Sequence, residues 1–227
     1  MSNKTNPDNT GMTAEEIAEA AWDNRKLNPY RLAAIEEFAG ESLLDVGCGN
    51  GAYVLALRDR MRTFGLDIKR YPSWEQAADH FDTCDAATLP VQDNSFETVT
   101  SFEVLEHIPN TVDTLREFSR VATKNVIFSV PNCEIPESFK QARLAYFHYT
   151  DPSHVNFFTE PDLRIACESA GLIAKETRPI NPCNMLPVVV DLFGAKSRIA
   201  KSIFKRLFRQ QYFMTLLVVA EVPRGNA

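Results

Sequence analysis

The sequence predicts an α/β fold built on a mostly parallel sheet, and three patterns indicate it. Short apolar runs typical of buried strands alternate with helical segments between residues 43 and 130, which implies parallel βαβ units. A glycine-rich turn, "GCGNG" at residues 47–51, separates the first of these strands from the next helix. Two apolar runs late in the chain indicate further strands, which fits an antiparallel edge on an otherwise parallel sheet.

The first part of the chain sets up this alternation. Apolar runs bounded by turn residues predict strands, and amphipathic segments predict helices. The expected elements are, in order, one or two helices in 13–39 interrupted at Pro29, a strand at 43–46, a helix at 52–60, a strand at 63–66, a short helix at 73–79 and a weak strand at 81–84.

The rest of the chain continues the pattern and then departs from it. The expected elements are a strand at 97–102, an amphipathic helix at 112–122, a strand at 125–130, a helix at 160–170, and strands at 172–178 and 212–222. Gly171 is a standard stop signal for the helix before it. A basic amphipathic helix is expected between the last two strands, at about 188–209.

Composition and length bound the kind of protein this is. The 227 residues, 44% of them hydrophobic, suffice for one large domain, expected at 13–227 after a polar, disordered tail at 1–12. A net charge of −6 argues against a protein that coats nucleic acid. Five scattered cysteines without a CxxC pair favour a reducing cytoplasm over a disulfide framework or a zinc site. No apolar run approaches the roughly 20 residues that span a bilayer.

The glycine-rich turn is the first candidate site. Gly47, Gly49 and Gly51 would let a flat or charged ligand approach the backbone, because glycine has no Cβ. A tight strand-to-helix turn without any ligand explains the same glycines.

Two aspartates at neighbouring strand ends favour the ligand. Asp67 follows the second strand, 20 residues after Gly47, where a carboxylate can accept both hydroxyls of a ribose. Asp85 follows the third strand, where an acceptor can take the exocyclic amine of a base. Either aspartate alone is equally explained as a helix cap. Together with the glycines they indicate a nucleoside site.

These residues resemble the class I S-adenosylmethionine-dependent methyltransferases. The matching stretches are "LLDVGCGNGAYVLAL", "GLDI", "DAATLPVQDNSFETVTSFEVLEHI" and the late "AGL", which cover roughly residues 40–180. The resemblance implies a Rossmann-like sheet of seven strands with helices on both faces and the last strand antiparallel. It also implies S-adenosyl-L-methionine as cofactor, with contacts from Asp45, Gly47, Gly49, Asp67, Ile68, Asp85 and Ala86.

A narrower resemblance is to the ubiquinone-biosynthesis O-methyltransferases. The segment "LNPYRLAAI" is similar to their NPxRL motif, which implies that Arg31 pairs with the cofactor's carboxylate. The planar fork of arginine suits this task. Phe102, just before an ExxEH motif, is implied as a further cofactor contact. A surface helix arginine is the alternative for Arg31.

The ExxEH motif carries a second candidate site. Glu103, Glu106 and His107 would share one helical face, and two carboxylates with an imidazole suit Mg²⁺ or Mn²⁺. Enzymes that methylate the terminal 2′-hydroxyl of small RNAs are similar and add a later histidine, to which His154 corresponds here. An ion held by Glu103, Glu106, His107 and His154 would lower the pKa of an acceptor hydroxyl.

The same residues admit readings without a metal. Glu106 and His107 can simply cap and pack their helix, and His107 or His154 can act as a general base because a neutral imidazole is poised near neutral pH. His148 with Asp151 forms a second local pair of this kind.

The expected function is an S-adenosylmethionine-dependent O-methyltransferase acting on a small molecule, a sugar or a lipid-linked hydroxyl. Metal-dependent RNA 2′-O-methylation is one alternative, which the acidic charge disfavours. A non-catalytic, cofactor-binding regulatory subunit is another, against which the complete cofactor set argues. The expected location is cytoplasmic. Peripheral membrane contact is expected if the basic helix binds anionic lipid. The alternative for this helix is that it packs on the core and exposes its basic face to solvent.

Overall fold

The computed structural model describes residues 26–141, 147–183, 202 and 212–223. The strands are β1 (Ser42–Val46), β2 (Arg62–Asp67), β3 (Phe81–Thr83), β4 (Phe96–Phe102), β5 (Ala122–Pro131), β6 (Ile173–Pro182) and β7 (Phe213–Glu221). The helices are α2 (Pro29–Phe38), α3 (Ala52–Leu57), α4 (Thr111–Val121), α5 (Glu137–Gln141) and α6 (Glu160–Ser169), with 3-10 helices η1 (Pro72–His80), η2 (Leu105–His107) and η3 (Phe147–Tyr149).

One sheet organises the described chain. It has seven strands in the order β3-β2-β1-β4-β5-β7-β6. The pairs from β3 to β5 are parallel, whereas β7 runs antiparallel to both β5 and β6. The predicted seven-stranded, mostly parallel sheet with an antiparallel last strand is therefore confirmed. The winding reverses between β1 and β4, which is where open α/β sheets bind ligands.

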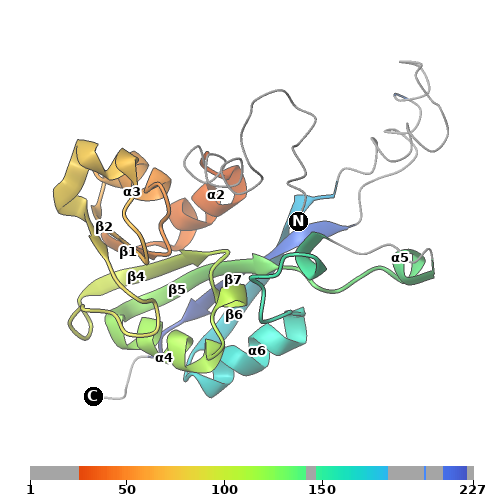
Figure 1. The fold of residues 1–227 in the computed structure, drawn as a ribbon. Coiled ribbons are helices and arrows are strands. Elements are labelled where there is room, and N and C mark those ends of the chain that lie inside the picture. The colour runs from red at the N-terminus through yellow and green to blue at the C-terminus, as the bar shows by residue number, and fades with distance from the viewer. Residues whose placement is uncertain (1–25, 142–146, 184–201, 203–211, 224–227) are drawn as a thin grey trace, which may run out of the picture.

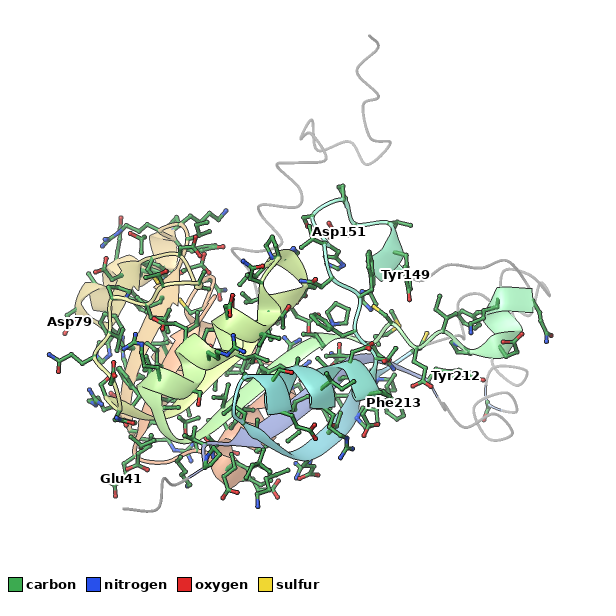
Figure 2. All side chains as sticks on the ribbon, turned by 90° about the horizontal axis from the view of Figure 1, so that it is seen from below. Glu41, Asp79, Tyr149, Asp151, Tyr212 and Phe213 are labelled. Carbon is green, nitrogen blue, oxygen red and sulfur yellow. The ribbon has the colours of Figure 1, made fainter. Side chains whose placement is uncertain are left out.

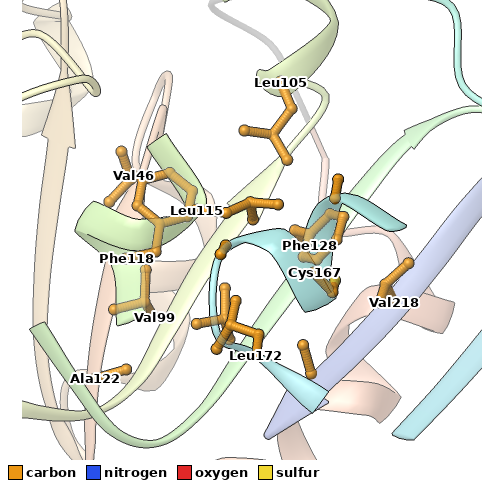
Figure 3. Close-up of a cluster of buried hydrophobic side chains, with 14 of the residues drawn as sticks. Val46, Val99, Leu105, Leu115, Phe118, Ala122, Phe128, Cys167, Leu172 and Val218 are labelled. Carbon is orange, nitrogen blue, oxygen red and sulfur yellow. The ribbon is translucent and has the colours of Figure 1, made fainter. Parts of the chain in front are cut away.

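Helices cover the sheet on both faces, as Figure 1 shows, with α2 and α3 on one side and α4 and α6 on the other. Burial on both faces explains why every residue of β1 is buried and why its sequence is almost continuously apolar. Figure 3 shows the larger core, in which Leu115 and Phe118 of α4 and Cys167 of α6 pack against strand residues such as Val99 and Phe128. Packing in this core fixes the positions of the strand ends, and those strand ends form the site described below.

Several predicted elements differ in detail. The helix expected at 52–60 ends at Leu57. The short helix expected at 73–79 is the 3-10 helix η1, interrupted by non-helical angles at Ala77. Of the helices expected in 13–39, α2 lies within the described residues. The basic helix expected at 188–209 and the tail at 1–12 lie outside them, Ser202 excepted.

Within the described ranges, no helix combines the length and the apolar character that crossing a bilayer requires.

Candidate functional site

The turn after β1 requires glycine on steric grounds. Gly47, Gly49 and Gly51 have φ of +73°, +54° and +74°, in the left-handed region. A Cβ on Gly47 would lie 2.2 Å from Cγ2 of Val104, which is closer than any real contact. At Gly49 no atom of the described residues lies within 4 Å of a built Cβ, so the turn is open there.

Three side chains fix this turn from the direction of β2 and η1. The indole Nε1 of Trp74 donates to the Gly49 carbonyl at 2.8 Å, and the Ser73 hydroxyl donates to the Asn50 carbonyl at 2.7 Å. The Gly49 N–H donates to Oδ2 of Asp67 at 2.8 Å. Trp74 is fully buried, and sequence reasoning missed its role. The available signal was a tryptophan in the short helix after the second strand.

A cavity of about 470 Å³ opens beside the turn, at the carboxyl ends of β1, β2 and β4. It brings together six of the predicted cofactor residues, namely Gly47, Gly49, Asp67, Ile68, Asp85 and Ala86. Cys84 also lines it, and burial together with nearby Asp85 raises the pKa of this thiol to about 11. The thiol therefore stays protonated at neutral pH.

A smaller cavity of about 130 Å³ adjoins the same turn. It is lined by the remaining predicted cofactor residues, Arg31, Asp45 and Phe102, and by Tyr53. Gly47 lines both cavities. A nucleoside with an attached amino-acid group fits this layout, because the Asp67 and Asp85 carboxylates line the larger cavity, and a cation and an anion, Arg31 and Asp45, line the smaller one.

Arg31 is not a surface arginine. Asn28 caps α2 by accepting from the N–H groups of Tyr30 and Arg31, and Pro29 occupies the first helical turn. Arg31 is 8% exposed, and its guanidinium carbon lies 5.3 Å from the centroid of the Phe102 ring. Its Nη2 donates to Oε1 of Glu103 at 2.6 Å. The capped helix thus directs this cation into the smaller cavity.

Asp45 is a buried acid at the end of β1. It is 2% exposed, and the Thr100 hydroxyl of the neighbouring strand donates to its Oδ1 at 2.8 Å. It faces the same cavity as Arg31.

Glu103 does not lie where the motif spacing predicts. Its φ is +57°, so the chain turns sharply here and η2 begins only at Leu105. Its N–H donates to the Ser129 carbonyl at 2.8 Å, and its Oε1 accepts from the Ser129 hydroxyl at 3.0 Å. The shared helical face expected for Glu103, Glu106 and His107 is therefore not formed.

The other three members of the predicted metal set do come together. Glu106, His107 and His154 each place one potential ligand atom within 4.8 Å of the others. Glu106 is 1% exposed, and the rings of the two histidines lie 4.8 Å apart. His107 also lines the larger cavity, so this cluster borders the cofactor region.

Backbone carbonyls fix the tautomers of both histidines. Nδ1 of His107 lies 3.1 Å from the Ser153 carbonyl, and Nδ1 of His154 lies 2.9 Å from the His148 carbonyl. A carbonyl oxygen only accepts, so Nδ1 must carry the proton in each ring. In its neutral form each ring then carries its lone pair on Nε2, and a lone pair of this kind can accept a proton or bind a metal ion.

The segment that carries His154 is tied to η2. The N–H groups of Val155 and Asn156 donate to the Glu106 carbonyl at 2.9 and 3.1 Å. The Asn156 side chain donates to the carbonyls of Leu105 and Ile108 at 3.1 and 2.6 Å. Figure 2 shows Asp151 of this segment at the opposite end of the molecule from Glu41, which precedes β1. Sequence reasoning missed Asn156, which no motif marks.

The alternative pair, His148 and Asp151, lies in the same segment as His154, and the charge of Asp151 acts on the His148 imidazole. His148 donates through Nε2 to the Met214 carbonyl at 3.0 Å, and burial lowers the pKa of its imidazole. Asp151 accepts from the side chain and backbone of Ser153, which holds the pKa of its carboxyl low, and its Oδ2 lies 3.7 Å from Nε2 of His154. Asp151 therefore faces the catalytic candidate His154.

Comparison with known proteins agrees with this geometry. Residues 17–174 match the family described as "Methyltransferase domain". A stretch of 147 residues is 30% identical to the ubiquinone biosynthesis O-methyltransferase of Hahella chejuensis, covering 55% of this chain and 61% of that protein. A stretch of 96 residues is 34% identical to the 27-O-demethylrifamycin SV methyltransferase of Amycolatopsis mediterranei, covering 37% of this chain and 35% of that protein. The chain thus spans less than two thirds of either relative.

Among solved structures, a SAM-dependent methyltransferase from Archaeoglobus fulgidus is similar with a TM-score of 0.61 at 18% identity, over 92% of this chain and 95% of that one. At this identity the likeness concerns the fold.

Proposed function

The chain belongs to the class I S-adenosylmethionine-dependent methyltransferases, and from this premise we propose that it methylates a hydroxyl oxygen. Membership makes the protein an enzyme with S-adenosyl-L-methionine as cofactor, so the regulatory-subunit alternative falls away. The observation that carries the choice of oxygen is His107. His107 lines the larger cavity, and its Nε2 can carry the lone pair because Nδ1 faces a carbonyl. Glu106 and His154 lie beside it.

The cofactor-binding roles follow from the two cavities. We expect Asp67 to accept from the ribose hydroxyls, Asp85 to lie by the adenine, and Arg31 to bind the carboxylate. Glycines at 47 and 49 let the backbone approach the ligand. The bound cofactor supplies an electrophilic methyl group on a sulfonium. The protein's remaining task is to align the acceptor and manage its proton.

His107 is proposed as the group that takes the acceptor's proton. An alcohol is a weak nucleophile, so a positioned base accelerates its attack by about 10²–10⁴-fold. The Ser153 carbonyl holds the Nδ1–H tautomer, which leaves Nε2 as the basic nitrogen. His154, whose ring lies 4.8 Å from that of His107, is the second candidate for this base.

A divalent ion at the cluster of Glu106, His107 and His154 is the alternative to His107 as the base, because an ion bound to Nε2 of His107 would occupy the lone pair that takes the proton. A carboxylate with two imidazoles suits Mn²⁺, and ligating histidines usually donate their other nitrogen to a carbonyl, as both do here. Such an ion would favour the deprotonated acceptor. The RNA alternative rested on a four-residue set that included Glu103, and Glu103 lies outside this cluster.

Oxygen as the acceptor atom is also supported by the names of both relatives, one an O-methyltransferase and the other acting on a 27-O-demethyl compound. We propose a small molecule, a sugar or a lipid-linked hydroxyl as acceptor. Peripheral membrane contact through the basic segment at 188–209 remains a prediction, because that segment lies outside the described residues.

Isotope transfer tests the reaction. Purified enzyme with methyl-labelled cofactor is incubated with lipid, glycan, metabolite and RNA fractions, and the labelled product is hydrolysed to identify the acceptor atom. His107→Asn should lower turnover by about 10²–10⁴-fold while cofactor affinity is retained. His80→Asn is the matched control, because His80 at the end of η1 bonds to the Thr63 carbonyl of β2 and lines neither cavity. Label on nitrogen or carbon, or full activity in His107→Asn, would contradict the proposal.

Titration with Mn²⁺ tests the ion separately. Calorimetry should show one site in the wild type and a large loss of Mn²⁺ affinity in Glu106→Gln. Turnover that survives exhaustive chelation would leave His107 as a metal-free base and remove the ion from the proposal.

A further inference from the structure

The Glu103 carboxylate is held in place from its own backbone and from β5. The residue adopts φ of +57°, a conformation that is unfavourable for a residue with a side chain. The N–H and the carboxylate of Glu103 both bond to Ser129, at 2.8 and 3.0 Å. The carboxylate therefore has little freedom to follow a moving partner, and strain at this point suggests a specific task.

The partner it holds is Arg31. A buried guanidinium needs a counter-charge, and Glu103 supplies it through a 2.6 Å contact to Nη2. The ring of Phe102 lies beneath the same guanidinium. Nε of Arg31 is buried and has no hydrogen-bond partner among the described residues. Since arginine has five N–H donors, the pair with Glu103 leaves donor capacity unused.

The ion pair crosses the junction of the two cavities. Arg31 lines the smaller cavity, Glu103 lines the larger one, and Gly47 lines both. We propose that Glu103 is a positioning residue, which holds the Arg31 guanidinium in the orientation that receives the carboxylate of the cofactor. This inference rests on the proposed contact between Arg31 and that carboxylate.

The physical gain is pre-organisation. A free arginine side chain loses much rotamer entropy when a ligand immobilises it, and Glu103 with Phe102 removes this cost before the cofactor arrives. The guanidinium can contact two carboxylates through different nitrogens, so Glu103 need not release it. This role replaces the metal-ligand role that the ExxEH spacing suggests for Glu103.

Two ligands distinguish an effect on the cofactor's carboxylate from a general weakening of nucleoside binding. S-adenosylhomocysteine carries the carboxylate, whereas 5′-methylthioadenosine keeps the nucleoside and lacks it. Calorimetry on the full chain should show about a tenfold weaker binding of S-adenosylhomocysteine to Glu103→Gln, the loss expected for one bond to a charged group. Binding of 5′-methylthioadenosine and of Mn²⁺ should not change. Glu97→Gln, at the opposite end of β4, is the matched control and should change none of the three.

A second variant tests whether Glu103 acts through Arg31. Arg31→Lys should also weaken S-adenosylhomocysteine selectively, and the double variant should lose less than the product of the two separate losses. Unchanged or tighter S-adenosylhomocysteine binding by Glu103→Gln would overturn the inference, as would an equal loss for both nucleosides or a loss of Mn²⁺ affinity. A wild type that binds neither nucleoside would instead refute the proposed function.

Discussion

Gly47 is the residue on which both cavities depend, because it lines each of them and has no room for a side chain. Two costs combine at this position. Its φ of +73° is strained for any other residue, and an added Cβ would overlap with Val104.

Gly47→Ala should therefore lower the free energy of unfolding by about 2–5 kcal/mol, the sum of left-handed strain and overpacking. Gly171→Ala is a matched control, because Gly171 has φ of +81° but nothing within 4 Å of a built Cβ. We expect a cost of about 1–2 kcal/mol there, from the left-handed strain alone. Urea denaturation measures both, and equal costs would show that Val104 moves aside freely.

Asp67→Ala should weaken S-adenosylhomocysteine by about 10–100-fold in calorimetry, since a charged acceptor for the ribose is lost. The bond to the Gly49 N–H disappears as well, which loosens the turn. Asp82→Ala on the neighbouring strand is the control, because that carboxylate bonds to the N–H of Thr83 and does not line the cavity. Unchanged affinity in Asp67→Ala would mean that the ribose lies elsewhere.

At the scale of elements, the sequence predicts the strands well because their burial leaves a simple signal. Each central strand is covered on both faces, so it reads as a short apolar run between turn residues. Gly47, Gly49 and the two aspartates could be placed at one edge because parallel strands end together. Their convergence on one cavity follows from the topology.

The candidate site was less predictable where backbone conformation overrides spacing. The ExxEH motif suggests one helical face, but the left-handed turn at Glu103 rotates this residue toward Ser129 and Arg31. No residue type in the motif signals such a turn, since glutamate rarely adopts it. The approach of His154 to Glu106 likewise depends on Asn156, whose bonds are long-range.

Asn156→Ala should lower the free energy of unfolding by about 1–3 kcal/mol, because two carbonyls of the η2 region lose their donor. If the cluster binds Mn²⁺, the affinity should fall too, since His154 is held by this segment. Asn110→Ala should cost less, because the Asn110 side chain makes no capping bond to α4. Thermal unfolding with and without Mn²⁺ measures both effects, and no change in either would exclude Asn156 as the anchor.

The start of α6 gives a pH-dependent prediction. Thr159 and Asp162 form a capping box, and the bonds from Thr159 hold the pKa of the Asp162 carboxyl below its usual value. A carboxyl with a lowered folded-state pKa stabilises the protein above its unfolded pKa of about 3.9, and this stabilisation is lost as the pH falls through the folded value. Asp162→Asn should therefore cost about 1 kcal/mol at neutral pH and progressively less in acid. A deficit in urea denaturation that does not depend on pH would contradict this assignment.

At the scale of the molecule, the cavities lie where the winding of the sheet reverses, so a cofactor bound as proposed would contact segments from α2 to η2 at once. Binding should therefore stabilise the whole fold. S-adenosylhomocysteine at 100 times its Kd should raise the Tm by about 5–11 °C, from about 2.7 kcal/mol of binding linkage and 2–4 °C per kcal/mol for a chain of this size. Adenine alone at the same concentration is the control and should raise the Tm less, because it lacks the ribose and the methionyl group. An equal shift for both ligands would mean that the methionyl group and the ribose add nothing to binding.

The bond from Trp74 to the Gly49 carbonyl gives the enzyme a built-in optical reporter. The indole is shielded from water and stacks on Phe81, while its N–H bonds to the turn beside the proposed cofactor cavity. Trp22 is the other tryptophan of the chain, so Trp22→Phe leaves a single emitter. The fluorescence of Trp74 would then report occupancy of the cofactor site in real time. Stopped-flow mixing would resolve cofactor binding from product release without a label.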